Sequence, residues 1–104
     1  MVTVVWEPWL KPGAEEEGLA LTRRIWSDMT HFEGYVSHCI IRDFDQKWHL
    51  LVVSEWMSRE AADRVRDEYA NAEPVQLITP LLVTPRKRWV FARDSGTVRA
   101  CKQG

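Results

Sequence analysis

The sequence predicts an α+β domain, an antiparallel sheet with two helices on one face. Strand-like and helix-like runs follow one another in the order β-α-β-β-α-β over residues 1–94, which is the split-βαβ, ferredoxin-like arrangement. The chain has 104 residues, enough for one hydrophobic core but small enough to leave much of its surface unburied. We therefore expect one domain over residues 1–94 and a C-terminal tail over residues 95–104.

The first third of the chain predicts a strand followed by a helix. Residues 1–10, MVTVVWEPWL, are β-branched and aromatic up to Pro8, a residue typical of strand ends. The KPG sequence then breaks the strand, and three glutamates at residues 15–17 suit the positive end of a helix dipole. Apolar residues recur at three- and four-residue steps as far as Phe32, and Gly34 can end the helix in a left-handed conformation.

The middle of the chain predicts a hairpin that is apolar on both faces. Residues 35–44 and 48–56 are strand-like and are joined by a short polar connection. Alternation along the second strand sets Trp48, Leu50, Val52 and Trp56 on one face and Leu51 and Val53 on the other. Along the first strand it sets Val36, His38 and Ile40 on one face and Tyr35, Cys39 and Ile41 on the other.

The remaining elements complete the predicted order. Ser58 is a good N-cap for a second helix that ends near Ala70. Residues 71–82 contain two prolines but keep a near-helical apolar spacing, which predicts a short, interrupted helix. Residues 83–94 predict the last strand, which follows Pro85.

Composition and motifs exclude several classes of function. Fourteen basic and fifteen acidic residues leave a formal net charge of −1, which favours neither nucleic acid nor an anionic membrane as a partner. No apolar run is long enough to span a bilayer, so a cytoplasmic protein is expected. Cys39 and Cys101 lack metal-ligand or redox spacing, and no nucleotide-binding, serine-hydrolase or zinc-protease motif occurs. The expected cofactors and metals are therefore none.

The two-sided apolar strands predict self-association. Two helices cover only one face of the sheet, and an uncovered face of Leu, Val, Ile and Tyr is a patch typical of an interface. We expect a homodimer in which two sheets pack face to face about a twofold axis. The alternative is a monomer in which the C-terminal tail folds over the open face.

The sequence resembles the antibiotic biosynthesis monooxygenase family, whose members form a dimeric α+β barrel. The resemblance rests on VTVVWEPWLKPGAEEE at the start, FEGY before the second strand, LLVVSEWMSREAADR, and TPLL after the second helix; SEWMSREA is its most specific element. It covers residues 2–93 and implies a pocket between sheet and helices in each subunit. Some relatives oxidise phenols or quinols there with molecular oxygen and no metal or flavin, and others degrade haem.

The resemblance carries some site residues over and not others. Trp56 matches a tryptophan at the end of the third strand in the anthrone oxygenases of the family. Val52 and Ala62 stand where those enzymes have an asparagine and a tyrosine. Val65 and Val75 stand where haem-degrading relatives have a tryptophan and a histidine, which disfavours haem breakdown.

The residues themselves suggest further site candidates. Alternation puts His38 on the expected pocket side, where a neutral imidazole is able to take a phenolic proton near pH 7; a core histidine is the alternative. The predicted catalytic residues are therefore His38 and Trp56, and the predicted substrate-binding residues are Trp26, Trp48, Val52, Tyr69 and Asn71. The basic cluster at residues 86–88 either attracts an anionic substrate or is a solvated strand edge.

The function expected from the sequence is a cofactor-independent monooxygenase that oxidises a small aromatic or quinol-like compound. One alternative is a non-catalytic protein that binds an apolar metabolite in the same pocket. Another is an isomerase or decarboxylase-like enzyme on the same dimeric scaffold, which needs acid-base groups but no oxygen.

Overall fold

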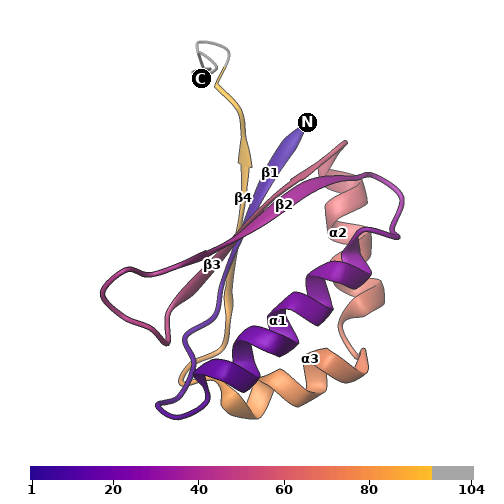
Figure 1. The fold of residues 1–104 in the computed structure, drawn as a ribbon. Coiled ribbons are helices and arrows are strands. Elements are labelled where there is room, and N and C mark those ends of the chain that lie inside the picture. The colour runs from indigo at the N-terminus through magenta and orange to yellow at the C-terminus, as the bar shows by residue number, and fades with distance from the viewer. Residues whose placement is uncertain (95–104) are drawn as a thin grey trace.

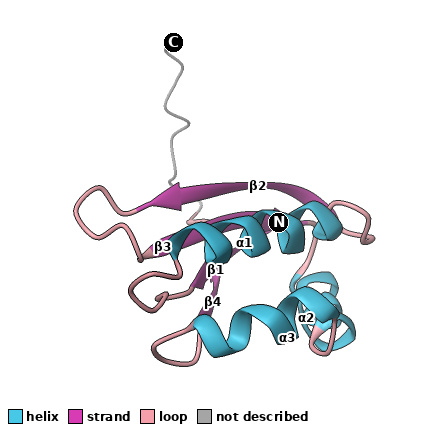
Figure 2. Ribbon diagram, turned by 60° about the horizontal axis from the view of Figure 1, so that its bottom comes forward, coloured by secondary structure: helices cyan, strands magenta, loops and turns pink. Residues whose placement is uncertain are grey.

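The computed structural model describes residues 1–94 and has the predicted ferredoxin-like α+β fold. Its strands form one antiparallel sheet in the order β2-β3-β1-β4, where β1 is Val2–Glu7, β2 is Tyr35–Arg42, β3 is Leu50–Trp56 and β4 is Lys87–Ala92. Figure 1 and Figure 2 show the helices α1 (Glu15–Met29), α2 (Arg59–Tyr69) and α3 (Glu73–Ile78) to one side of this sheet. The predicted tail, with Cys101, lies outside the described residues.

Helix α1 lies against the sheet through the apolar face that the sequence predicts. Its buried residues are Gly18, Leu21, Thr22, Ile25, Trp26 and Met29, and the glutamates of its first turn stabilise the positive end of the helix dipole. Gly18 permits a close approach to the end of the first strand, because a Cβ at that position would overlap the Leu10 side chain.

The strands are shorter than the strand-like runs in the sequence. β1 ends at Glu7 because Pro8 has no N–H for the ladder, and residues 9–10 make only isolated bridges. The hairpin loop extends to His49, whose N–H bonds to the Gln46 carbonyl at 3.0 Å. The predicted strands 1–10, 35–44, 48–56 and 83–94 are therefore too long at their ends.

One prediction for β2 is wrong in register. A bulge between Tyr35 and Ser37 places Tyr35 opposite Trp56 and His38 opposite Ser54, so both side chains turn to the helix-covered face. Alternation predicted opposite faces for these two residues, because it does not foresee the extra residue that a bulge inserts. Val36, expected to share a face with His38, is 39% exposed.

Helix α2 begins at the predicted cap and is held against the turn that precedes β2. The Oγ of Ser58 accepts a hydrogen bond from the Ala61 N–H at 3.1 Å. Gly34 has φ +92°, and a Cβ there would lie only 2.5 Å from the Ala61 Cβ. Ala62 and Val65 on the same helix are buried towards the sheet.

The short, interrupted helix predicted after α2 is also confirmed. It consists of α3 and a 3₁₀ helix at Thr79–Leu81. Each piece has a proline in its first turn, where the missing N–H costs nothing. An ion pair of 2.7 Å between Arg24 and Glu73 joins α3 to α1.

The second face of the sheet has no helix over it within residues 1–94. On this face Ile41, Trp89 and Phe91 are 46%, 42% and 51% exposed, and Val5 and Val53 pair between them in the central strands. The face is therefore apolar and open. None of the helices over residues 1–94 has the length and apolar character needed to cross a membrane.

His49 sits at the end of this open face in a charged cluster. Its ring stacks on Trp9 with centroids 3.7 Å apart, and its two nitrogens bond to the carboxylates of Asp43 at 2.7 Å and Glu7 at 2.5 Å. Burial lowers the pKa of His49, but the hydrogen bonds to Asp43 and Glu7 outweigh that effect and raise it overall. The cluster favours a protonated imidazole.

Candidate functional site

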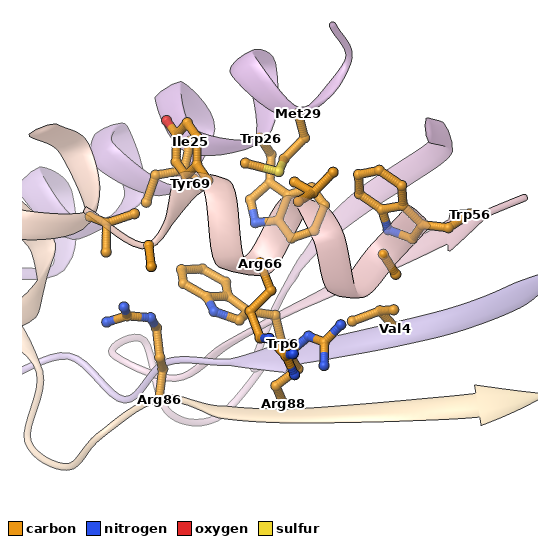
Figure 3. Close-up of a pocket in the computed structure, with 14 residues that line it drawn as sticks. Val4, Trp6, Ile25, Trp26, Met29, Trp56, Arg66, Tyr69, Arg86 and Arg88 are labelled. Carbon is orange, nitrogen blue, oxygen red and sulfur yellow. The ribbon is translucent and has the colours of Figure 1, made fainter. Parts of the chain in front are cut away.

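A cavity of about 160 Å³ lies between the helix-covered face of the sheet and helices α1 and α2. It is lined mainly by apolar side chains from β1, α1, β3 and α2, with arginines from α2 and from the start of β4: Val4, Trp6, Ile25, Trp26, Met29, Trp56, Ala62, Val65, Arg66, Tyr69, Ala70, Val75, Arg86 and Arg88. Figure 3 shows this lining. An engineered cavity of about 150 Å³ holds one benzene ring, so the volume of this partly open cavity matches a single aromatic ring.

Three tryptophans form the flat walls of the cavity. Trp6 and Trp26 meet edge to face with ring centroids 6.2 Å apart. Trp56 is 2% exposed and fixed by a hydrogen bond from its Nε1 to the Ser54 Oγ at 3.0 Å. Ser54 in turn donates to the Val4 carbonyl at 3.2 Å. Rigid aromatic walls of this kind give a planar ligand a large stacking area.

The Nε1 of Trp26 is a buried donor without a partner. Trp26 is 6% exposed, and no hydrogen-bond acceptor in residues 1–94 reaches its Nε1. In Figure 3 this nitrogen faces the side of the cavity where Trp6 lies. A buried N–H left unpaired is costly, and an acceptor oxygen of a ligand or a water in the cavity would remove that cost. An oxygen atom on the ligand fits this donor.

Tyr69 lines the cavity from α2, but its hydroxyl already donates a hydrogen bond within the protein. Its hydroxyl donates to the Asp28 carboxylate at 2.6 Å, which links α2 to α1. Burial raises the pKa of Tyr69, and the bond to Asp28 raises it further. Tyr69 therefore stays protonated and offers the ligand a ring edge rather than a base.

Arginines occupy the mouth of the cavity, where the sequence analysis left two interpretations open. Arg86 and Arg88 reach the lining together with Arg66, whereas Lys87 is exposed and pairs opposite Glu7 on the other face. Figure 3 shows the three arginine side chains on the same side of the cavity as Trp6, across from Met29 and Ile25. Arg86 and Arg88 therefore line the cavity, and of the three residues in the basic cluster only Lys87 fits the interpretation as a solvated strand edge.

His38 lies beside the cavity rather than in its lining. Its ring is tilted against Trp26 with centroids 5.4 Å apart, and its Nδ1 is 2.7 Å from the Tyr35 hydroxyl. Partial burial lowers the pKa of His38, so the neutral imidazole dominates at pH 7. Tyr35 meets Trp56 edge to face. The bulge in β2 therefore joins His38, through Tyr35 and Trp26, to two walls of the cavity.

The other predicted substrate-binding residues lie away from the cavity. Val52 is fully buried in the core, Trp48 lines a separate hollow near Pro12, and Asn71 is exposed, with its carbonyl accepting a hydrogen bond from Gln76. Trp26, Trp56 and Tyr69 are the predicted site residues that the fold brings together.

Sequence reasoning did not select Trp6 or Arg66. Alternation along β1 puts Trp6 on the same face as Val4, and helical spacing puts Arg66 four residues after Ala62, so both signals were present. The cavity lining contains no Asp, Glu, His or Cys. Within residues 1–94 no group of three such residues is arranged to hold a metal ion.

Comparisons with known proteins show the fold. No family model matches the chain, and no curated protein matches it. Solved structures do: an antibiotic biosynthesis monooxygenase shares 19% identity over 90% of this chain and 99% of its own, with a TM-score of 0.80. SnoaB, a cofactor-independent oxygenase from Streptomyces nogalater, shares 20% identity over 91% of this chain and 95% of its own, with a TM-score of 0.77. Rv0793 from Mycobacterium tuberculosis shares 22% identity over 92% of this chain and 98% of its own, with a TM-score of 0.78.

The chain therefore has the fold of the antibiotic biosynthesis monooxygenases over nearly its whole length, as the sequence resemblance predicted. Identities at this level establish the fold and leave the reaction to be argued from the site.

Proposed function

We propose that the protein is a monooxygenase that oxidises a small phenol or quinol-like compound with molecular oxygen and without a cofactor. The observation that carries the proposal is the unpaired Trp26 N–H in an apolar cavity walled by Trp6 and Trp56. Such a donor stabilises the oxygen of a phenolate in surroundings of low dielectric, where the interaction is strong. The fold shared with SnoaB, a cofactor-independent oxygenase, supports the same chemistry.

The proposed reaction needs no external reductant. A phenol with a free ring carbon para to its hydroxyl loses the O–H and C–H hydrogens and gains one oxygen atom of O₂ at that carbon, which gives a quinone. The second oxygen atom leaves with both hydrogens as water. The ring supplies all four electrons that O₂ accepts, so the protein has only to bind the phenol and favour its anion.

His38 is our candidate base for the phenolic proton. When its Nδ1–H donates to the Tyr35 oxygen, the Nε2 lone pair is free to accept a proton, and the Tyr35 oxygen then stabilises the imidazolium. The substrate hydroxyl must reach the edge of the Trp26 ring for this transfer, since His38 lies on that side of it.

We also propose that the protein works as a homodimer. Ile41, Trp89 and Phe91 lie exposed on the open face of the sheet, and a second copy of the same face is complementary to them under twofold symmetry. The cytoplasmic location and the division into residues 1–94 and 95–104 stay predictions from the sequence.

Oxygen uptake tests the function. Purified protein, stripped of metal, is mixed with 1-naphthol or one-ring phenols in an oxygen electrode, and quinone is followed by absorbance. We expect one O₂ consumed per quinone formed and a rate at least about tenfold lower in His38→Ala, with His31→Ala as a control because His31 is exposed. Absence of protein-dependent uptake refutes the oxygenase.

One observation favours a second candidate, a protein that binds the same class of compound without turnover. The cavity lining has no carboxylate, imidazole or thiol, so every group in direct contact with the ligand is unable to take its proton at neutral pH. Quenching of tryptophan fluorescence by phenols, without oxygen uptake, would establish this function instead.

A further inference from the structure

The mouth of the cavity carries more positive than negative charge. Its lining includes Arg66, Arg86 and Arg88, and the carboxylates bonded to these arginines are those of Asp63 and Asp67. Three positive charges against two negative ones leave an excess of one, on a chain whose formal net charge is −1. Asp63 is moreover shared, because Arg59 also pairs with it at 3.5 Å.

Among the three arginines of the lining, Arg86 is the one without a counter-ion in residues 1–94. Its hydrogen bond within residues 1–94 goes to the neutral Thr79 Oγ1 at 3.3 Å, and no carboxylate of that range lies within ion-pair distance. Arg88, by contrast, bonds to Asp63 at 2.9 Å. Burial lowers the pKa of Arg86, which reflects the cost of keeping this charge away from water. A partly buried cation of this kind suits an anionic ligand.

The shape of the site separates a ring position from an acid position. The cavity, of about 160 Å³, is partly open and adjoins a hollow of about 550 Å³ that shares Trp6 and the three arginines with it and continues along residues 82–85. A ligand that fills the cavity with one ring therefore presents its substituent at the junction, where the Arg86 head is placed. Another edge of the ring then faces the Trp26 wall of the cavity.

We propose that this site takes a one-ring aromatic acid, bound as its carboxylate by Arg86, with a second oxygen on the ring accepting from the Trp26 Nε1. The inference rests on the proposed function, since it names the substrate class for the same cavity. It makes Arg86 a specificity-determining residue. A planar guanidinium holds a carboxylate through two parallel hydrogen bonds, which a neutral amide cannot reproduce.

Anaerobic binding separates this inference from the oxygenase. The probes are 4-hydroxybenzoate and its neutral isostere 4-hydroxybenzamide, titrated into the full chain and followed by calorimetry. We expect the acid to bind at least about tenfold more tightly than the amide. Arg86→Gln should remove the preference and Arg86→Lys should reduce it. Arg23→Gln removes the same charge at an exposed position of α1 and should leave the preference unchanged.

Three results would overturn the inference: equal affinities for acid and amide in the unmodified protein, no binding of either probe, or an unchanged preference in Arg86→Gln. Because the comparison of the two probes uses the unmodified protein, it stands even if Arg86→Gln fails to fold. Oxygen uptake with neutral phenols, without tighter binding of the acid than of the amide, would support the oxygenase function and refute the aromatic acid as its substrate class. Tight binding of the acid, with no oxygen uptake from phenols whose para carbon is free, would support the aromatic acid and refute the oxygenase; 4-hydroxybenzoate itself reports binding only, because its para carbon carries the carboxylate.

Discussion

Replacing Trp26 with Phe should destabilise the protein less than replacing Trp56 with Phe, although both changes remove the same atoms from one cavity wall. Both indoles are buried, 6% and 2% exposed, so the lost ring volume should cost a similar free energy at each position. Their N–H groups differ, because Trp56 donates to Ser54 whereas Trp26 has no acceptor in residues 1–94.

The size of the difference follows from these two N–H groups. Removing the Trp56 bond costs about 1 kcal/mol net. Removing the Trp26 N–H relieves a buried unpaired donor, a penalty of about 1–3 kcal/mol when nothing accepts from it, and so offsets part of the lost ring volume. We expect the free energy of unfolding of Trp56→Phe to lie below that of Trp26→Phe by about 2–4 kcal/mol.

Urea unfolding followed by far-ultraviolet circular dichroism measures both variants without using tryptophan fluorescence as the signal. The transition slopes should agree, so that the midpoints report stability. For binding of 4-hydroxybenzoate the order should reverse, with Trp26→Phe weakened by about tenfold. Equal midpoints, or a lower midpoint for Trp26→Phe, would refute the assignment of an unpaired donor to the cavity.

Three further predictions follow from the fold. Gly34→Ala should lower the free energy of unfolding by about 3 kcal/mol, from a positive φ and a contact 2.5 Å from a neighbouring Cβ; a loss below about 1 kcal/mol in urea would contradict this. The pKa of His49 is raised in the fold, so its stabilising contribution is complete below its ordinary value of 6.5 and is lost as the pH rises through the raised pKa. In Glu7→Gln the free energy of unfolding should fall less as the pH rises, as measured by unfolding curves at a series of pH values. An unchanged pH profile would refute the contribution of Glu7 to the raised pKa of His49. Phe91→Glu on the open sheet face should halve the mass seen by analytical ultracentrifugation, whereas Phe44→Glu in the hairpin loop, where Phe44 is fully exposed, should not; a monomeric unmodified protein would refute the dimer.

Much of the fold follows from local signals in the sequence. The glutamates before α1, Ser58 before α2, and the prolines at residues 74 and 80 act within one or two turns of the chain, and each marks an element boundary found in the structure. Gly34 was also identified locally, as a left-handed helix end, and it has φ +92°. Its second role, a close approach to α2, depends on a helix that begins far along the chain.

The candidate site was only partly predictable, because its groups come from six separate elements. Periodicity identified Trp26 and Trp56 as inward-facing, but no sequence pattern pairs them with Trp6. The bulge in β2 places Tyr35 on the same face as His38. The alternation of residues along a strand does not predict where one extra residue is inserted.

The sequence by itself determined the order of the elements, the face of each helix that is buried and the apolar character of both sheet faces, because propensity and periodicity act between neighbours. Tertiary structure alone decided which donors and cations are left without partners. Trp56 has its acceptor two residues away at Ser54, whereas Trp26 finds none in residues 1–94. Whether Arg86 or Arg88 has a carboxylate depends on residues such as Asp63, which the fold brings within 4 Å from a distant part of the chain. A hydrogen bond or ion pair exists only at that range, and the sequence does not contain the distance.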